Sequence, residues 1–338
     1  MTASTSVSPQ YKPRTARLKR VLQHEATQRV LAFAALIILI IGFSLGSENF
    51  LQFRNISGIF LATAVNGILA LGVTFVIITG GIDLSIGTVM TFAAVMMGVF
   101  ITDWGWPVEI GILGGVLAGG LAGLINGFVI AKMKVPPFVA TLGMMYIAKG
   151  LSLIIAELAP IYFTSVEGFQ AIATGSILGN LIPGFNIPNA VLIMFAAGIV
   201  SSFILFKTTL GRYTFAIGSN EEATRLSGVN VDRWKILVYT VSGLLAGLGG
   251  VVMSARVNSA QPSLGQGYEL DAIAAVVIGG TSLSGGEGSI VGTIIGAFVI
   301  SVLTNGLRIM SVPQEWQIVI TGCIIIVAVY FDMIRRRS

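Results

Sequence analysis

Residues 56–87 read ISGIFLATAVNGILALGVTFVIITGGIDLSIG, and the part at 56–79 carries no charge. A helix needs about 20 consecutive apolar residues to cross the hydrocarbon core of a bilayer. The run at 56–79 meets this length, and the pair Gly80-Gly81 closes it because glycine weakens a helix interior. Another apolar run starts directly after Asp83. The stretch therefore predicts a membrane-spanning helix that breaks at its end and is followed at once by the next span.

The rest of the 338-residue chain repeats this apolar pattern. Hydrophobic residues make up 54% of the chain and charged residues only 10%, whereas about a quarter of a soluble domain is charged. A soluble globular domain is thereby excluded. The predicted fold class is all-α: a polytopic membrane protein of about ten transmembrane helices, some of them interrupted. The expected spans are 30–46, 56–79, 84–101, 108–131, 137–156, 189–207, 235–254, 270–280, 289–306 and 316–333.

Basic residues orient these spans. On a ten-span arrangement all but four of the 20 Lys and Arg residues fall on one side, and Lys and Arg collect in cytoplasmic loops. We therefore expect a cytoplasmic N-terminal tail at 1–29, one transmembrane domain at 30–334 and a cytoplasmic C-terminal tail at 335–338. Because this topology accounts for the positive charge, no nucleic-acid partner is expected.

Two passages of the chain resemble each other. Residues 76–100 read VIITGGIDLSIGTVMTFAAVMMGVF and residues 276–300 read VVIGGTSLSGGEGSIVGTIIGAFVI, so that each has a helix end, a GGxxLS turn and a glycine-rich helix. Interrupted helices at matching places of an internal repeat are typical of a transport pathway. We therefore predict helix breaks at Gly80, Gly81, Gly279 and Gly280. Chance recurrence in a chain with 42 glycines is the alternative.

Two rows of glycines recur at every fourth residue, which places each row along one side of a helix. Small residues in such a row let a second helix approach closely in a membrane. The rows therefore predict packing contacts, and the sequence leaves open whether the partner helix belongs to the same chain or to a second copy. They are Gly115, Gly119, Gly123 and Gly127, and Gly288, Gly292 and Gly296.

The polar loop at about 208–234 carries the signature of one short helix. Asn220 suits its N-cap, Glu221 and Glu222 its first turn, and Gly228 a left-handed stop, while Arg225 lies four residues after Glu221. Two interpretations stay open at this point. The helix is either an ordinary capped connector, or a docking element whose Ala223 and Leu226 enter a groove on a cytosolic partner.

At this loop the sequence resembles a known family. The stretches GRYTFAIGSNEEATRLSGVNVDRWK at 211–235, SAQPSLGQGYELDAIAAVVIGGTSLSGGEGSIVGT at 259–293 and GVTFVIITGGIDLSIG at 72–87 are similar to the membrane permeases of ribose-type ATP-binding-cassette sugar importers. The resemblance implies a bacterial inner-membrane permease that works as a pair and translocates a ribose-like monosaccharide. It further implies that the pair Glu222-Ala223, with Gly228, contacts the ATPase.

The same resemblance implies the partners. These are a cytoplasmic ABC ATPase subunit, a periplasmic sugar-binding protein, a second permease copy in a homodimer or heterodimer, and the lipid bilayer. The permease itself binds no cofactor, because ATP and Mg are used by the ATPase. Residues 283–287 read LSGGE and imitate an ATPase signature loop, but no GxxxxGK[ST] phosphate loop accompanies them. With one His and one Cys in the chain, neither a catalytic triad nor a metal site is expected, so the chain is predicted to be no enzyme.

Polar residues inside apolar runs are functional candidates because an unpaired polar group in hydrocarbon costs several kcal/mol. Amide and hydroxyl groups along a water-accessible path are suited to binding a neutral sugar. Two candidates have structural explanations: Lys149 can extend toward the membrane interface, and Asp83 can cap the following helix. The rival function is an ion-gradient-driven secondary transporter, which usually needs carboxylates or His at mid-membrane. The translocation-pathway candidates are Asn66, Thr74, Asp83, Asn126, Asp271 and Asn305.

Overall fold

The computed structural model describes residues 25–182, 184 and 186–337. Within these residues helices joined by turns and loops make up most of the chain, and the strands are β1 and β2, which pair antiparallel over two residues. In chain order the elements are α2 (Glu25–Gly46), α3 (Phe53–Ile78), α4 (Ile86–Gly98), the π-helix η1 (Val99–Asp103), α5 (Val108–Ala131), α6 (Pro137–Ile155), β1 (Ile161–Tyr162), α7 (Ala171–Thr174), α8 (Ile177–Leu181), α9 (Asn189–Lys207), α10 (Thr209–Ser219), α11 (Glu221–Leu226), α12 (Val231–Val257), β2 (Ser259–Ala260), α13 (Tyr268–Ile278), α14 (Ile290–Ile309) and α15 (Gln314–Arg337).

The predicted all-α, polytopic fold class is confirmed. In the described part of the chain, 8 helices are long and apolar enough to cross a membrane. The two other expected spans are α13, which has only 11 residues, and α15, whose apolar part is Gln314–Val327. Helix α2 begins at Glu25 and its apolar span at Arg29. The tail predicted at 1–29 stays a prediction, because residues 1–24 lie outside the described part.

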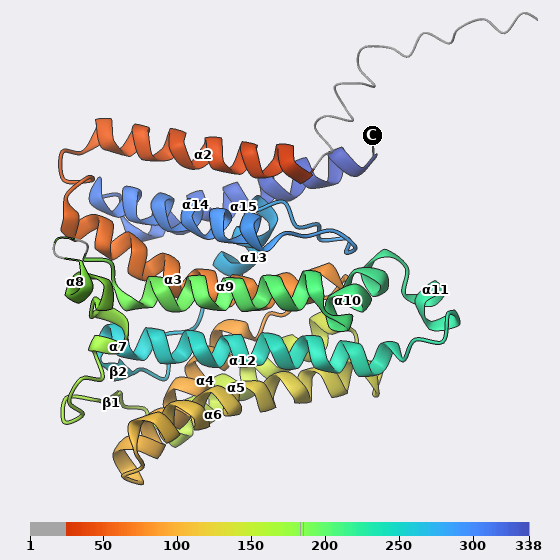
Figure 1. The fold of residues 1–338 in the computed structure, drawn as a ribbon, viewed down its shortest axis with the longest axis horizontal. Helices are drawn as coiled ribbons and strands as arrows, with labels where there is room; N and C mark the ends of the chain where they lie inside the picture. The colour runs from red at the N-terminus through yellow and green to blue at the C-terminus, as the bar shows by residue number, and fades with distance from the viewer. Residues whose placement is uncertain (1–24, 183, 185, 338) are drawn as a thin grey trace, which may run out of the picture.

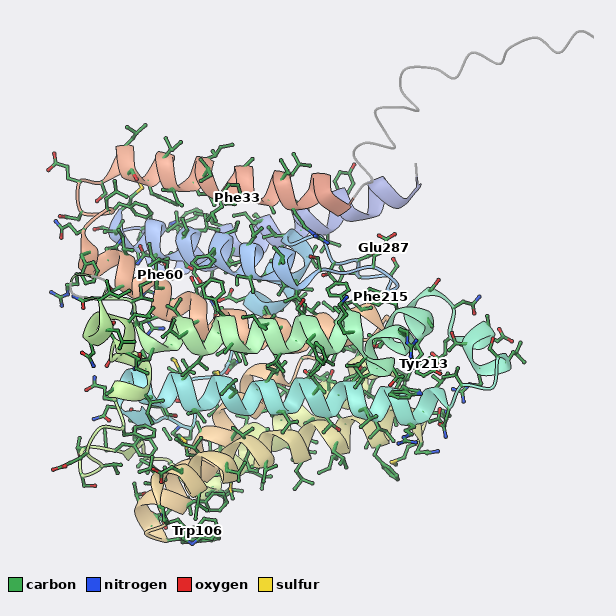
Figure 2. All side chains as sticks on the ribbon, viewed as in Figure 1. Phe33, Phe60, Trp106, Tyr213, Phe215 and Glu287 are labelled. Carbon is green, nitrogen blue, oxygen red and sulfur yellow. The ribbon has the colours of Figure 1, made fainter. Side chains whose placement is uncertain are left out.

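The long helices lie side by side along one axis (Figure 1). Helices α10 and α11 stand at one end of this bundle, which we call the α11 end, and β1, β2, α7 and α8 gather at the opposite end, the β1 end. Helix α2 starts and helix α15 finishes at the α11 end. Trp106 lies toward the β1 end (Figure 2).

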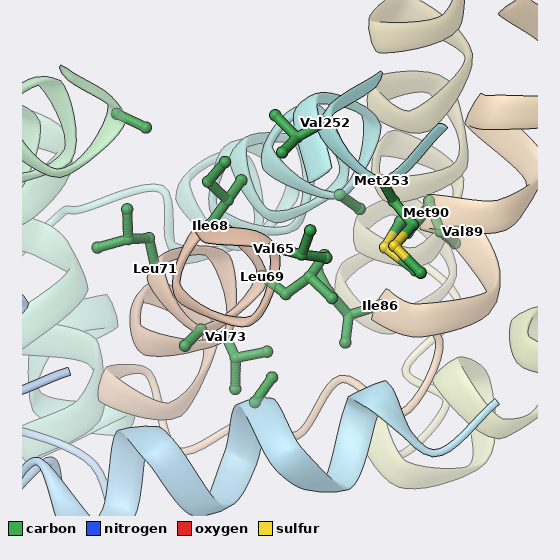
Figure 3. Packing of buried hydrophobic residues seen from close by; sticks show 14 of the residues in the cluster. Val65, Ile68, Leu69, Leu71, Val73, Ile86, Val89, Met90, Val252 and Met253 are labelled. Carbon is green, nitrogen blue, oxygen red and sulfur yellow. The ribbon is translucent and has the colours of Figure 1, made fainter. Parts of the chain in front are cut away.

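Helix α3 forms the centre of the bundle, and all its residues from Thr63 to Ile78 are buried. Its Ile68 and Leu69 pack with Met90 of α4 and with Val252 and Met253 of α12 (Figure 3). By contrast, α2 and α6 leave most of their surface open. The break that follows α3 starts from this enclosed helix, with Thr79 and Gly81 buried and Gly80 exposed.

The glycine row of α5 faces α12 of the same chain. A Cβ atom on Gly119 would overlap the Gly243 carbonyl, and one on Gly123 would overlap the Tyr239 carbonyl. In the same way Gly292 and Gly296 of α14 lie against the backbone of α13. Both rows are therefore packing contacts between helices of one chain, which the sequence left open.

We expect Gly119→Val to destabilise the folded chain by about 1–3 kcal/mol, because the added atoms would force α5 away from α12. The matched control is Gly143→Val on α6, where an added Cβ meets nothing within 4 Å. The measurement is the thermal unfolding midpoint of the purified chains in detergent. A midpoint for Gly119→Val equal to that of Gly143→Val would contradict the packing described here.

A non-helical segment runs back into the bundle between β2 and α13. Gly265 packs against Gly87 and Thr91 of α4, and Leu264 shares a small hollow with Met90 and Ala94. Non-helical backbone is tolerated at membrane depth only where protein covers it or where it lines a wet cavity. The segment 259–267 therefore returns to the start of α4 with Pro262 and Gly265 buried against the helices around it, while Ser263 and Gln266 remain exposed.

Candidate functional site

The two predicted helix breaks have the same backbone geometry. After α3, the Gly80 and Gly81 amides donate to the carbonyls of Ile77 and Val76 over 2.8 and 3.1 Å. After α13, the Gly280 and Thr281 amides donate to Val277 and Val276 over 2.9 and 3.1 Å. Gly80 has φ +76° and Gly280 φ +90°, a conformation that favours glycine.

This geometry corrects the alignment of the two glycine pairs. The left-handed residue is the first glycine of the pair Gly80-Gly81 but the second of the pair Gly279-Gly280. The other two glycines serve close packing: a Cβ on Gly81 would meet the Tyr239 hydroxyl, and one on Gly279 would overlap the Gly292 carbonyl. When the two GGxxLS motifs are aligned by sequence, the left-handed residues of the two breaks therefore lie one position apart.

The two breaks touch each other, and the end of α10 touches both. The Gly286 amide, in the loop after the second break, donates to the Ile78 carbonyl over 2.9 Å. A Cβ on Gly218, the residue before the last of α10, would overlap that same carbonyl and the Gly286 amide. A Cβ on Gly285 would lie 2.9 Å from both the Gly218 carbonyl and the Gly80 amide. We call Ile78, Gly80, Gly218, Gly285 and Gly286 the glycine junction.

Asp83 follows the first break and is buried among hydroxyl and amide groups. Its Oδ1 accepts from the Ser85 amide at 2.9 Å and from the Ser85 hydroxyl at 2.6 Å, and its Oδ2 accepts from Ser242 of α12 at 3.0 Å. Asn126 of α5 donates to the Ser85 hydroxyl at 2.9 Å. The network therefore joins the start of α4 to α5 and α12. It brings two pathway candidates, Asp83 and Asn126, together.

The other four pathway candidates lie apart from this network. Thr74 is fully buried and its hydroxyl is 2.7 Å from that of Thr293, so it joins α3 to α14. Asn66 on α3 and Asn305 on α14 each keep an amide oxygen without a hydrogen-bond partner among the described residues. Asp271 lies in the first turn of α13 and is half-buried. Neither Thr74 nor Asn126 is accessible in this conformation.

Helix α11 has the caps that the loop sequence predicts. The Asn220 side chain accepts from the Ala223 amide at 2.9 Å, and Gly228 has φ +83° after the helix end. Thr224 faces inward and donates to the Ala216 carbonyl of α10 at 2.9 Å. Leu226 is 83% exposed. With Glu222 and Ala223, which are also exposed, it gives α11 an outward surface of one acidic and two apolar side chains.

Ion pairs hold α11 to its neighbours. Glu221 accepts from Arg225 at 3.2 Å and from Lys235 of α12 at 2.6 Å. Arg225 also pairs with Asp232 at 3.1 Å, and Asp232 with Lys134 of the loop before α6 at 2.9 Å. Asp232 therefore ties α11 to two other elements. Asp232 was not among the residues predicted from the sequence, although its position in the first turn of a span beside several basic residues was a usable signal.

Low pH is expected to loosen this attachment. Burial opposes ionisation of Glu221, but hydrogen bonds from Lys235 and Arg225 outweigh it and hold the pKa of this carboxyl below its ordinary value of 4.5. A lowered pKa stabilises the folded state above pH 4.5 and loses this effect as the pH falls through the folded-state pKa. Since the pair is partly exposed, Glu221→Gln should cost less than about 1 kcal/mol at pH 7. Thermal unfolding should show the parent and the variant converging as the pH falls below 4.5, whereas a constant difference would contradict this.

A large lateral groove lies between α2, α3, α9 and α14, with a volume of about 920 Å³. Phe33 of α2 and Phe60 of α3 line it (Figure 2), and nearly all its other lining side chains are apolar. Such a groove has few partners for the hydroxyl groups of a sugar, because polar ligands need convergent polar groups. We therefore do not place a sugar there.

Helices long and apolar enough to cross a bilayer, with two helix breaks in mutual contact and a capped helix beyond them, define a multi-pass membrane permease. Residues 55–329 match the family described as branched-chain amino acid transport system / permease component. The chain belongs to this family. No solved structure matches the chain significantly.

Curated relatives are similar over nearly their full length. The chain is 42% identical over 321 residues to the ribose import permease protein RbsC of Bacillus subtilis (strain 168), covering 95% of this chain and 97% of the relative. Identity to the fructose import permease protein FrcC of Rhizobium meliloti is 36% over 329 residues, covering 95% and 89%. Identity to the xylose transport system permease protein XylH of Escherichia coli (strain K12) is 34% over 358 residues, covering 90% and 91%.

Proposed function

We propose that the chain is the permease subunit of an ATP-binding-cassette importer for a ribose-like monosaccharide. The similarity to ribose, fructose and xylose permeases supports a sugar as cargo. Ribose is the first choice because the ribose import permeases share 40–42% of their residues with this chain. The permease holds no nucleotide of its own, and ATP and Mg are used by a separate ATPase subunit.

The ATPase docks on α11, and this places the α11 end in the cytoplasm. The accumulation of Lys and Arg at this end agrees with that orientation: Lys132, Lys134, Lys207, Arg212, Arg225, Arg233 and Lys235 belong to its loops and helix ends. Both chain termini then face the cytoplasm. The β1 end faces a sugar-binding protein outside the membrane, and a second permease copy completes the transporter.

One observation carries the mechanism: the end of α10 contacts both helix breaks through Gly218. Helix α10 continues directly into α11 at Asn220. When the ATPase closes and moves α11, the displacement reaches Gly218 within a few residues. Because Gly218 lies on Ile78 and Gly286, both breaks shift together, and the helices on each side of them tilt to switch the path from outward to inward.

The test is uptake of radiolabelled ribose into liposomes that contain the chain, its ATPase and a loaded binding protein. We expect uptake to require internal ATP and to stop when the ATPase is left out. The control holds a proton or sodium gradient across the same liposomes without ATP. Uptake driven by the gradient alone would overturn the proposal, because it would mean that the chain is a secondary transporter.

A further inference from the structure

One open face of the bundle carries polar side chains at membrane depth. The Lys149 ammonium of α6 donates to the Gln266 side-chain oxygen over 2.9 Å. Gln266 belongs to the segment that returns into the bundle before α13, and it is exposed, as is Ser263 of the same segment. Helix α6 buries only a narrow stripe, formed by Ala140, Thr141, Met144, Ala148 and Ser152.

Lys149 is hydrogen-bonded to a side chain of the return segment. It stands six residues before the end of α6 at Ile155, which is about 9 Å at a rise of 1.5 Å per residue. Its ammonium points to Gln266, next to Gly265, which packs on the first turn of α4 at Gly87. Hydrogen bonding to Gln266 therefore gives Lys149 a polar partner within the chain.

Such a surface is unfavourable against lipid. Ammonium, amide and hydroxyl groups at this depth avoid a large penalty only when they face water or other protein. They are also groups that bind a neutral sugar: the ammonium has three donors, the amide both donates and accepts, and the Ser263 hydroxyl does both. Lys149, Gln266 and Ser263 surround no measurable free volume within the single chain. A site built here is therefore incomplete without a second surface opposite it.

We propose that Lys149, Gln266 and Ser263 form one half of a sugar-contacting surface in the translocation path, and that the same residues of a second copy supply the other half. This inference rests on the proposed function. It assigns the sugar hydroxyls to the Gln266 amide, with Lys149 holding that amide in place and offering its remaining donors. Asp83, Thr74 and Asn126 have structural roles inside the chain instead.

The first experiment measures water accessibility. Cys323 is the one cysteine of the chain, so Cys323→Ser provides a background for Ser263→Cys, Gln266→Cys and the control Leu117→Cys, an open apolar position of α5. A charged, membrane-impermeant methanethiosulfonate reagent is applied to the reconstituted complete transporter. We expect Ser263→Cys and Gln266→Cys to react at least about 10-fold faster than Leu117→Cys, since thiols in lipid stay protonated and out of reach. Equal rates would overturn the proposal.

The second experiment separates contact with sugar from folding. Gln266→Leu and Lys149→Met are assayed for ribose uptake over a range of loaded binding protein, next to Leu117→Ala. We expect uptake to fall about 10-fold or more in Gln266→Leu, as happens when a hydrogen-bonding site loses its partner, and to recover partly in Gln266→Asn. ATP hydrolysis stimulated by the binding protein should persist. Parental uptake in Gln266→Leu would contradict the proposed sugar-contacting surface and leave the proposed function standing. A parent complex without ATP-dependent uptake would contradict the proposed function itself.

Discussion

Replacing Leu226 with aspartate is expected to reduce ATP-driven uptake by about 30-fold or more, because the loss of one central apolar anchor costs an interface at least about 2 kcal/mol. Leu226 is 83% exposed on a helix of 6 residues, so the variant should leave the fold intact. An exposed leucine on so short a helix contributes nothing to the stability of the folded chain by itself. Its effect must therefore come from what covers it in the complex.

The measurement is the affinity between the purified chain and the ATPase, followed in parallel with uptake and with thermal unfolding. Met133→Asp is the matched control, since Met133 is 62% exposed at the same end of the bundle but lies outside α11. Equal losses in both variants would mean that any charge at this end is harmful. A Leu226→Asp chain with parental affinity would remove α11 from the ATPase interface.

The periodic features of the fold were predictable from the sequence. Apolar runs of about 20 residues have few alternatives in a bilayer, so nine of the ten expected spans match one apolar helix each, and the short α13 was expected as well. The caps of α11 were predictable for a similar reason: Asn220 and Gly228 act within four residues of their own position. Local chemistry of this kind leaves a local signature.

Contacts between distant segments left no such signature. Ser242 lies 159 residues from Asp83, and Thr293 lies 219 residues from Thr74, so nothing in either sequence neighbourhood identifies the partner. The candidate list therefore contained Asp83 and Thr74 but missed Ser85, Ser242 and Thr293. It was chosen on the principle that polar groups at membrane depth mark a path. Hydrogen bonding inside the chain satisfies the same groups equally well, and the sequence does not separate the two cases.

Gly218 was missed because it stands in a sequence context without any repeat or row of glycines. Its importance comes from the meeting of three chain segments that are each about 70 residues or more apart: the end of α10, the break after α3 and the loop after α13. Close approach of two backbones requires glycine at the contact. A single glycine therefore carries a contact that the sequence alone cannot distinguish from the other 41.

Gly218→Ala is expected to bring uptake below about a tenth of the parental rate. The added Cβ would overlap the Ile78 carbonyl, so the end of α10 must withdraw from both breaks, at a cost of about 1–3 kcal/mol for overpacking. The outward surface of α11 is untouched by this change. ATPase affinity should thus stay at the parental value while transport is lost, whereas Leu226→Asp is expected to lose both.

Two further variants decide whether the loss comes from the glycine junction or from poor folding. Gly143→Ala, on α6 where an added Cβ meets nothing within 4 Å, should transport normally. Gly286→Ala alters the other side of the junction, because its Cβ would lie 3.2 Å from the Ser219 Cα and its φ of +80° disfavours alanine. If α10 drives both breaks, Gly286→Ala should also hydrolyse ATP without importing sugar. If either junction variant keeps its thermal midpoint and imports at the parental rate, the displacement of α11 must reach the path by another route. The ion pairs from α11 to Asp232 and Lys235 at the start of α12 offer one such route.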